Sequence, residues 1–450
     1  MPRALPRRTH LSVSVVVAAA MLLAPAARAA QAPDDAPHYR GGSAIELAGV
    51  RDAFIAQHGD LPIAAIRLEG LRRTHPVVID QFLHAGPGDL LSSLNVVDLY
   101  ERLYGLAIFS SVAIELVPTD DTVTIVIRIE EKWTLYPVPL IWLFEGTEVV
   151  GLVLAEANAF GYNKGLAFGG VYSNRGWYTI AAYVDPNIAF SSFWGNLEGF
   201  AGSGFVENDA PDGHIAQSFD LTRVDVQYAV GYTLWDRLSP TLTGAFRWGK
   251  VEKVHVPGAE PPSGVMFVDQ GLKLIYSNRK YRFYYDEGVR LSAEVQHGFP
   301  VDGKSPAFNG VIVDGSVETH VLGESSVAAS FHATVADFPV VFEDRLGGLD
   351  GSRTLPGGGV IAADRYLSGT IAYQLPLATA GFGTLTGLVF AEAGAYARND
   401  EPVTSYGGPG TGLRFYLRNI SVPAVGVDVG YELNSQRVSF SVVIGYRPSR

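Results

Sequence analysis

Alternating apolar and polar residues dominate the second part of the chain and predict β-strands with one apolar face. Apolar residues alternate with glycine, serine or charged residues over 223–232, 241–248, 425–431 and 438–446. Turn signals separate these segments at intervals of roughly 10 to 25 residues. No helical period follows Val138, so we expect residues 138–446 to form an all-β domain.

The polar faces of these strands are rich in Gly, Ser, Thr and Ala and poor in charge. A soluble sheet would present more Lys and Glu to water, whereas an enclosed lumen and a lipid-facing apolar wall suit this pattern. A soluble β-sandwich or propeller remains an alternative. About 310 residues, at roughly 20 per strand and connection, correspond to 14 to 18 strands, and single-chain bacterial barrels have even numbers. We expect a transmembrane β-barrel of sixteen antiparallel strands.

Residues 62–134 have a different pattern, which predicts a β-α-α-β-β unit with α+β architecture. A short strand leads to Gly70, and Pro76 suits the first position of a helix that ends before 86–88. A second helix follows Ser93, and alternating apolar residues then predict two strands before residue 130. One apolar sheet face and two amphipathic helices make a small core. The plainer alternative is an α+β spacer without a binding role.

The N-terminal residues have the three parts of an export signal. Arg3, Arg7 and Arg8 precede the apolar segment 12–23, which is too short for a membrane-spanning helix, and 27–29 reads Ala-Arg-Ala. We expect a signal peptide over 1–29 and a leader with a short helix over 30–61.

Composition excludes several classes of function. The net charge of −12 argues against a nucleic-acid partner, and the absence of Cys excludes disulfides and thiolate chemistry. The ten His residues form no H-E-x-x-H motif and no triad with a G-x-S-x-G serine, and the glycines at 410–412 precede no lysine. We expect no enzyme activity, no cofactor and no metal site.

Two residues near the end of the chain stand out. Arg353 lies in a glycine-rich segment, GGLDGSRTLP (347–356), and Glu392 lies inside an apolar strand, VFAEAG (389–394). A lone carboxylate in such a strand is costly, so a partner is expected. Together they suggest a loop that folds into the barrel and is pinned there.

Several stretches resemble known signatures. IRLEGLRRT (66–74), ERLYGLAIFSSV (101–112) and IVIRIEEKW (125–133) resemble the three signature stretches of a POTRA domain, and the chain has room for one. EANAFGYNKG (156–165), YSNRK (276–280), DEGVRL (286–291), the segment 347–356, FAEAG (390–394) and GLRFY (412–416) resemble BamA/TamA-type outer-membrane assembly and translocation barrels, the bacterial surface antigen family. The loop departs from that family's usual Val-Arg-Gly-Phe/Tyr by having Thr354 and Leu355, and four residues follow Tyr446.

The resemblance implies an outer-membrane barrel with its POTRA domain in the periplasm. Its partners are unfolded outer-membrane or secreted client polypeptides, outer-membrane lipid and periplasmic accessory proteins. Clients leave by a lateral gate between a first strand near Thr147–Glu156 and a last strand over Arg437–Tyr446. A client strand pairing with the open edge keeps backbone groups away from lipid.

The resemblance also assigns roles to single residues. Arg353 meets Glu392 in the lumen as a loop-to-barrel latch, Arg414 lies close enough to compete for the acid, and Phe440, Gly445 and Tyr446 form the terminal strand signal. The alternative is that Arg353 and Glu392 are independent lumen charges. Two other functions also stay open: a passive outer-membrane channel or structural barrel, and a two-partner secretion transporter for one exported protein.

Overall fold

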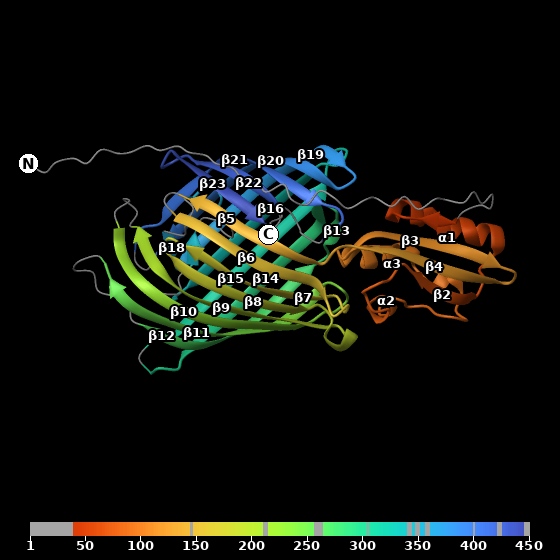
Figure 1. The fold of residues 1–450 in the computed structure, drawn as a ribbon, viewed down its shortest axis with the longest axis horizontal. Coiled ribbons are helices and arrows are strands. Elements are labelled where there is room, and N and C mark those ends of the chain that lie inside the picture. Colours follow the sequence, from red (N-terminus) through yellow and green to blue (C-terminus); the bar gives the residue numbers. More distant parts are fainter. Residues whose placement is uncertain are drawn as a thin grey trace, which may run out of the picture. The chain divides into compact units, whose positions relative to one another are not determined.

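Strands account for most of the structure, a computed structural model in which a small sheet is followed along the chain by a large barrel (Figure 1). It describes residues 39–144, 147–209, 215–255, 264–303, 305, 307–339, 344–346, 352–355, 361–398, 401–420 and 425–444. The expected signal peptide, Gly445 and Tyr446 lie outside these residues.

Residues 39–134 form an α+β region around a four-stranded sheet of order β1-β3-β4-β2. β3 and β4 are antiparallel, and β2 pairs with β4 in parallel. The elements are β1 (Arg40–Gly41), α1 (Ala44–His58), β2 (Ile63–Glu69), α2 (Val77–Asp80), the 3-10 turn η1 (Leu91–Ser93), α3 (Val96–Gly105), β3 (Phe109–Thr119) and β4 (Thr122–Glu131).

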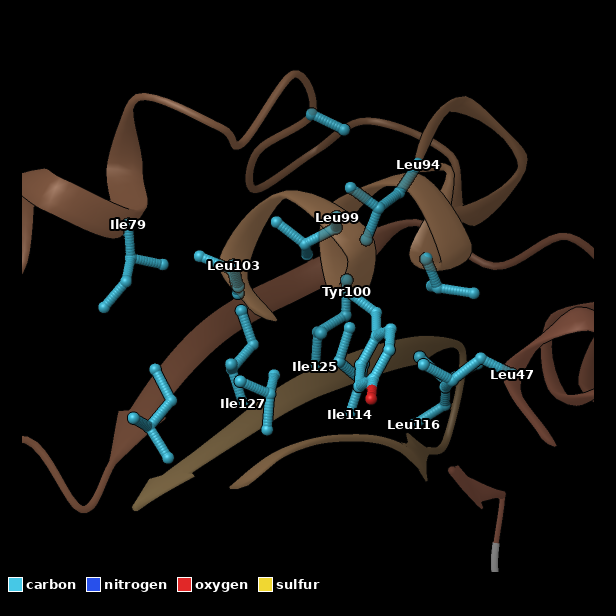
Figure 2. Packing of buried hydrophobic residues seen from close by; sticks show 14 of the residues in the cluster. Leu47, Ile79, Leu94, Leu99, Tyr100, Leu103, Ile114, Leu116, Ile125 and Ile127 are labelled. Carbon is cyan, nitrogen blue, oxygen red and sulfur yellow. The ribbon is translucent and has the colours of Figure 1, made fainter. Parts of the chain in front are cut away.

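Figure 2 shows the core of this region, in which side chains from α1, α2 and α3 meet β3 and β4. Phe54 and Leu103 are fully buried there, as are Ile114 and Ile127 from the sheet. α1 begins after Ser43, whose hydroxyl accepts a hydrogen bond from the Glu46 amide at 3.2 Å. The core therefore includes residues that we assigned to the leader.

The first predicted helix is shorter than its apolar pattern suggested. α2 has only four residues, and after it the amides of Phe82 and Leu83 bond to the carbonyls three residues back, at 2.9 and 3.1 Å. Among the described residues, no helix is long and apolar enough to cross a bilayer.

The remaining strands close into an antiparallel barrel, which settles the choice against a β-sandwich or propeller. Its order contains seventeen described strands, and β13 is a three-residue addition, so the expected sixteen long strands are present. They are β5 (Leu135–Phe144), β6 (Thr147–Ala159), β7 (Lys164–Ser173), β8 (Gly176–Asp185), β9 (Phe193–Asp209), β10 (Ile215–Tyr232), β11 (Leu238–Val254), β12 (Val265–Ser277), β14 (Tyr285–Pro300), β15 (Phe308–His320), β16 (Ser326–Ala336), β19 (Arg365–Ala380), β20 (Gly383–Ala397), β21 (Thr404–Leu417), β22 (Val425–Glu432) and β23 (Arg437–Ile444).

Short elements lie in the connections. They are the 3-10 turn η2 (Ile188–Phe190), β13 (Lys280–Arg282), which pairs with β14, and the hairpin of β17 (Asp344–Leu346) with β18 (Ile361–Ala363). This hairpin belongs to the long connection between β16 and β19, which also carries Arg353.

Exposure of the strands matches a lipid-facing outer wall. The apolar side chains that alternate with polar ones are the exposed set, with Leu272 at 67% and Ile371 at 62% exposure. The polar set, including Asp269, Glu392 and Asp428, is buried. A soluble barrel would reverse this arrangement, so the wall has the polarity of a transmembrane barrel.

The first barrel strand corrects our expectation. β5 begins at Leu135 and is the neighbour of the last strand, β23, so Thr147–Ala159 is the second strand and not the gate strand that we predicted. Pro137 and Pro139 argued against a strand in this segment, because proline has no backbone N–H for the hydrogen-bond ladder and is usually found in edge strands, at strand starts or at bulges.

Candidate functional site

The segment carrying Arg353 is buried, although it belongs to a loop. Ser352 and Thr354 are each 1% exposed, and Leu355 packs with Tyr366 and Tyr406 from the barrel wall. Connecting loops usually run over a protein's surface. This loop instead folds inward and rests on the lumen faces of β20 to β23.

Glu392 holds the loop by the residues on either side of Arg353. One carboxylate oxygen accepts hydrogen bonds from the Ser352 hydroxyl, the Thr354 amide at 2.9 Å and the Thr354 hydroxyl at 2.8 Å. The other accepts from the Thr370 hydroxyl on β19 at 3.2 Å. These donors compensate the burial of the carboxylate, because hydrogen bonds to a charged acceptor are strong.

Arg353 itself extends away from Glu392. Its guanidinium carbon lies 3.8 Å from the centre of the Phe390 ring, and its Nη1 lies 3.7 Å from Oδ2 of Asp428 on β22. The side chain is only 4% exposed, so both contacts are shielded from water. The guanidinium is therefore stacked on an aromatic face and paired with an acid.

Asp428 is also the partner of Arg414. Arg414 donates from Nη1 to Oδ1 at 2.7 Å and from Nη2 to Oδ2 at 2.6 Å, and both side chains are fully buried. The Nη1 atom also donates to the carbonyl of Val427 at 3.3 Å. Two arginines from distant parts of the sequence thus share one carboxylate.

These contacts correct the direct Arg353–Glu392 bond that we predicted. Glu392 and Arg353 both fasten the same loop, but through different partners. Glu392 accepts hydrogen bonds from Ser352 and Thr354, whereas Arg353 pairs with Asp428. Arg414 does share an acid with Arg353, as expected of a neighbour, but that acid is Asp428 and not Glu392.

The strand register explains where Arg353 rests. Phe390, Gly410, Gly430 and Ser439 lie side by side on four successive strands. A Cβ on Gly430 would lie 2.4 Å from the carbonyl oxygen of Arg353, and one on Gly410 would lie 2.1 Å from the Phe390 ring. The two glycines therefore leave a trough in the wall, which the Phe390 ring and the Arg353 backbone fill.

The last strand takes part in this contact. The Ser439 hydroxyl on β23 donates a hydrogen bond to the Arg353 carbonyl. The loop is thereby tied to the strand that closes the barrel against β5. Phe440, the next residue, is 48% exposed on the outer face.

Sequence reasoning missed Asp428, Phe390 and Ser439. Asp428 was visible as the one charged residue between Gly426 and Gly430 on the lumen face of its strand, and that was the available signal. Among the described residues, no group of three or more His, Asp or Glu side chains is placed to hold a metal. The site offers ion pairs and hydrogen bonds, and these bind one segment of the chain to another.

Comparison with known proteins gives structural matches only. No protein-family model matches the sequence, and no curated protein matches it. CdiB from Escherichia coli aligns with a TM-score of 0.59 at 15% identity, covering 86% of this chain and 80% of that one. CdiB from Acinetobacter baumannii aligns with a TM-score of 0.53 at 12% identity, covering 86% and 75%.

A BamA structure also matches. BamA from Haemophilus ducreyi lacking POTRA domains 1–3 aligns with a TM-score of 0.52 at 15% identity, covering 83% of this chain and 81% of that one. The three alignments span most of each chain, whereas their identities are low enough to establish the fold alone. The chain therefore has the fold of the BamA and CdiB barrels.

Proposed function

We propose that this protein inserts or translocates client polypeptides at the bacterial outer membrane through a lateral opening of its barrel. The observation that carries the proposal is the buried loop, which is fastened to β20, β22 and β23 beside the closing strand pair. A loop held by an ion pair to β22 and a hydrogen bond to β23, next to the seam where β23 meets β5, is positioned to keep the barrel closed or to release it.

The strand β5, which neighbours β23 where the barrel closes, is weakened as a hydrogen-bonding partner. β5 contains Pro137 and Pro139, which supply no backbone donor. The two prolines are two residues apart, so both missing donors lie on the same edge of the strand. Opening there exposes a strand edge that a client strand can satisfy.

The N-terminal α+β region serves as the POTRA domain in this proposal and receives clients in the periplasm. β2 stands at the end of its sheet and has β4 as its neighbour. At the start of its other edge Ile63 is already hydrogen-bonded to Gly88 and Asp89. In this proposal the rest of that edge offers main-chain donors and acceptors, which bind an extended peptide with little dependence on sequence. Periplasmic accessory proteins would dock on the same region.

Depletion of the protein distinguishes this function from its two alternatives. Loss of several other barrels from the outer membrane supports insertion, and loss of one secreted protein supports two-partner secretion. A change in solute uptake alone supports a passive channel and contradicts the proposal.

The Arg353→Ala variant provides the matched test of the loop. We expect it to assemble as a barrel, judged by heat-modifiable gel mobility, and to lose most client assembly or secretion. Arg365→Ala serves as the control, because it removes an arginine whose side chain is 50% exposed and whose Nε lies 3.6 Å from Oδ1 of Asp364. Full activity of Arg353→Ala would refute the role of the loop.

A further inference from the structure

A small cavity lies where the N-terminal region meets the barrel. Its volume is about 220 Å³, and it is lined by Tyr104, Ser110, Lys132, Phe283 and Arg418. These residues come from α3, β3, the link from β4 to β5, the link from β13 to β14, and the position directly after β21. The volume is below the roughly 300–1,000 Å³ of pockets for drug-sized ligands, so it suits one functional group.

Two cations face this cavity, and aromatic rings support both. The Lys132 ammonium lies 5.5 Å from the centre of the Tyr281 ring and donates to the Tyr281 hydroxyl at 3.4 Å. The Arg418 guanidinium lies 5.5 Å from the centre of the Phe283 ring. A ring face attracts a cation but accepts no conventional hydrogen bond from the guanidinium fork. Among the described residues, Arg418 makes no ion pair with an acid.

Acids on the elements that line the cavity are already engaged by other cations. Glu101 on α3 pairs with Lys280 at 2.6 Å and with Arg282 at 3.6 Å. Arg282 also pairs with Glu287 at 3.0 Å. These contacts fix the segment that carries Tyr281 and Phe283 against α3, so the aromatic supports of both cations are held in place.

The cavity also offers hydroxyl groups. Burial raises the pKa of Tyr104, and the nearby Arg418 and Arg282 offset only part of that rise. The phenol therefore stays protonated at neutral pH and can donate a hydrogen bond. An oxyanion in the cavity would meet an ammonium, a guanidinium fork and this hydroxyl.

The backbone sets the direction in which the site faces. The Trp133 amide donates to the Asn419 carbonyl at 2.9 Å, which joins the segments that carry Lys132 and Arg418. Trp133 is 60% exposed, whereas Lys132 is only 7% exposed. Successive side chains of extended backbone point to opposite faces, so Lys132 points away from the face that Trp133 exposes.

We propose that this cavity binds a carboxylate of a polypeptide, either an acidic side chain or a chain terminus, as the client passes from the N-terminal region to the barrel. The inference rests on the proposed function for the identity of its ligand. A guanidinium fork binds a planar carboxylate through two parallel hydrogen bonds. The inward direction of Lys132 favours a peptide over a lipid headgroup, whose acyl chains would have to remain in the bilayer.

The test uses the full chain in nanodiscs of a zwitterionic lipid and two forms of one short peptide, with a free terminal carboxylate or a terminal amide. We expect the acid to bind the wild type about tenfold more tightly than the amide, as measured by fluorescence anisotropy. Arg418→Gln should remove that difference, and Arg418→Lys should keep part of it. Arg51→Gln, which removes a charge on α1, is the control and should leave the difference unchanged.

Equal binding of acid and amide by the wild type would overturn the proposal, as would an unchanged preference in Arg418→Gln. Inorganic phosphate and discs containing phosphatidylglycerol form a second arm. If Arg418→Gln abolishes binding of these but keeps the acid–amide difference, the cavity is a phosphate site and the proposal fails. Loss of client assembly in Arg353→Ala, measured in parallel, would leave the proposed function standing in either case.

Discussion

Asp428 should contribute far more to the stability of the barrel than Arg353, although the two are partners. Asp428→Asn removes the charge that Arg414 contacts at 2.6 and 2.7 Å, and it leaves a fully buried guanidinium without its counter-ion. Breaking a buried pair in this way costs roughly 3–5 kcal/mol. Arg353→Met leaves the Arg414–Asp428 pair intact and loses a 3.7 Å contact together with stacking on Phe390. That loss amounts to about 2 kcal/mol.

The assay is urea unfolding of the barrel in lipid vesicles, followed by tryptophan fluorescence and extrapolated linearly to water. Client assembly should not follow stability. Both variants break the contact between Arg353 and Asp428, so both should lose client assembly. Arg414→Met combined with Asp428→Leu removes the whole buried pair and should recover stability without recovering activity. Equal stability losses in Asp428→Asn and Arg353→Met would refute the assignment of Asp428 as the shared partner.

Three further predictions follow from single contacts. Glu392→Gln should release the loop while the barrel still closes, seen as faster proteolysis within 347–356, and an unchanged cleavage rate would contradict the hydrogen bonds that Thr354 makes. Gly430→Ala places a methyl group 2.4 Å from the Arg353 carbonyl, so it should lower activity without altering any charge; wild-type activity would show that the trough tolerates it. Burial alone would raise the pKa of Glu131. Hydrogen bonds from Thr74 and from the backbone amides of Arg73 and Arg72 outweigh that effect, so the pKa is lowered. Because the pKa of Glu131 is lower in the folded than in the unfolded state, its ionised carboxylate stabilises the fold above pH 4.5, and this stabilisation is lost as the pH falls below 4.5. The loss of thermal stability in Glu131→Gln should therefore shrink below pH 4.5, and a difference that stays constant would contradict this.

The candidate site shows where inference from sequence stops. Glu392 and Arg353 were recognisable because a buried strand carboxylate and a loop arginine are both unusual. Their partners were not recognisable, because Glu392 and Asp428 both face the lumen on nearby strands and only the register decides which one the guanidinium reaches. The residues Phe390, Gly410, Gly430 and Ser439 align across β20 to β23 although they are far apart in the chain.

The sequence by itself determined the barrel and its polarity, and it bounded the number of strands to about 14 to 18. An alternation with period two records which face of each strand is apolar, and that information is local. The tertiary structure decided that β5 is the strand at the seam, that Asp428 is shared by two arginines, and that the loop is tied to β23. Each of these depends on pairing between residues far apart in the chain, which local pattern does not specify.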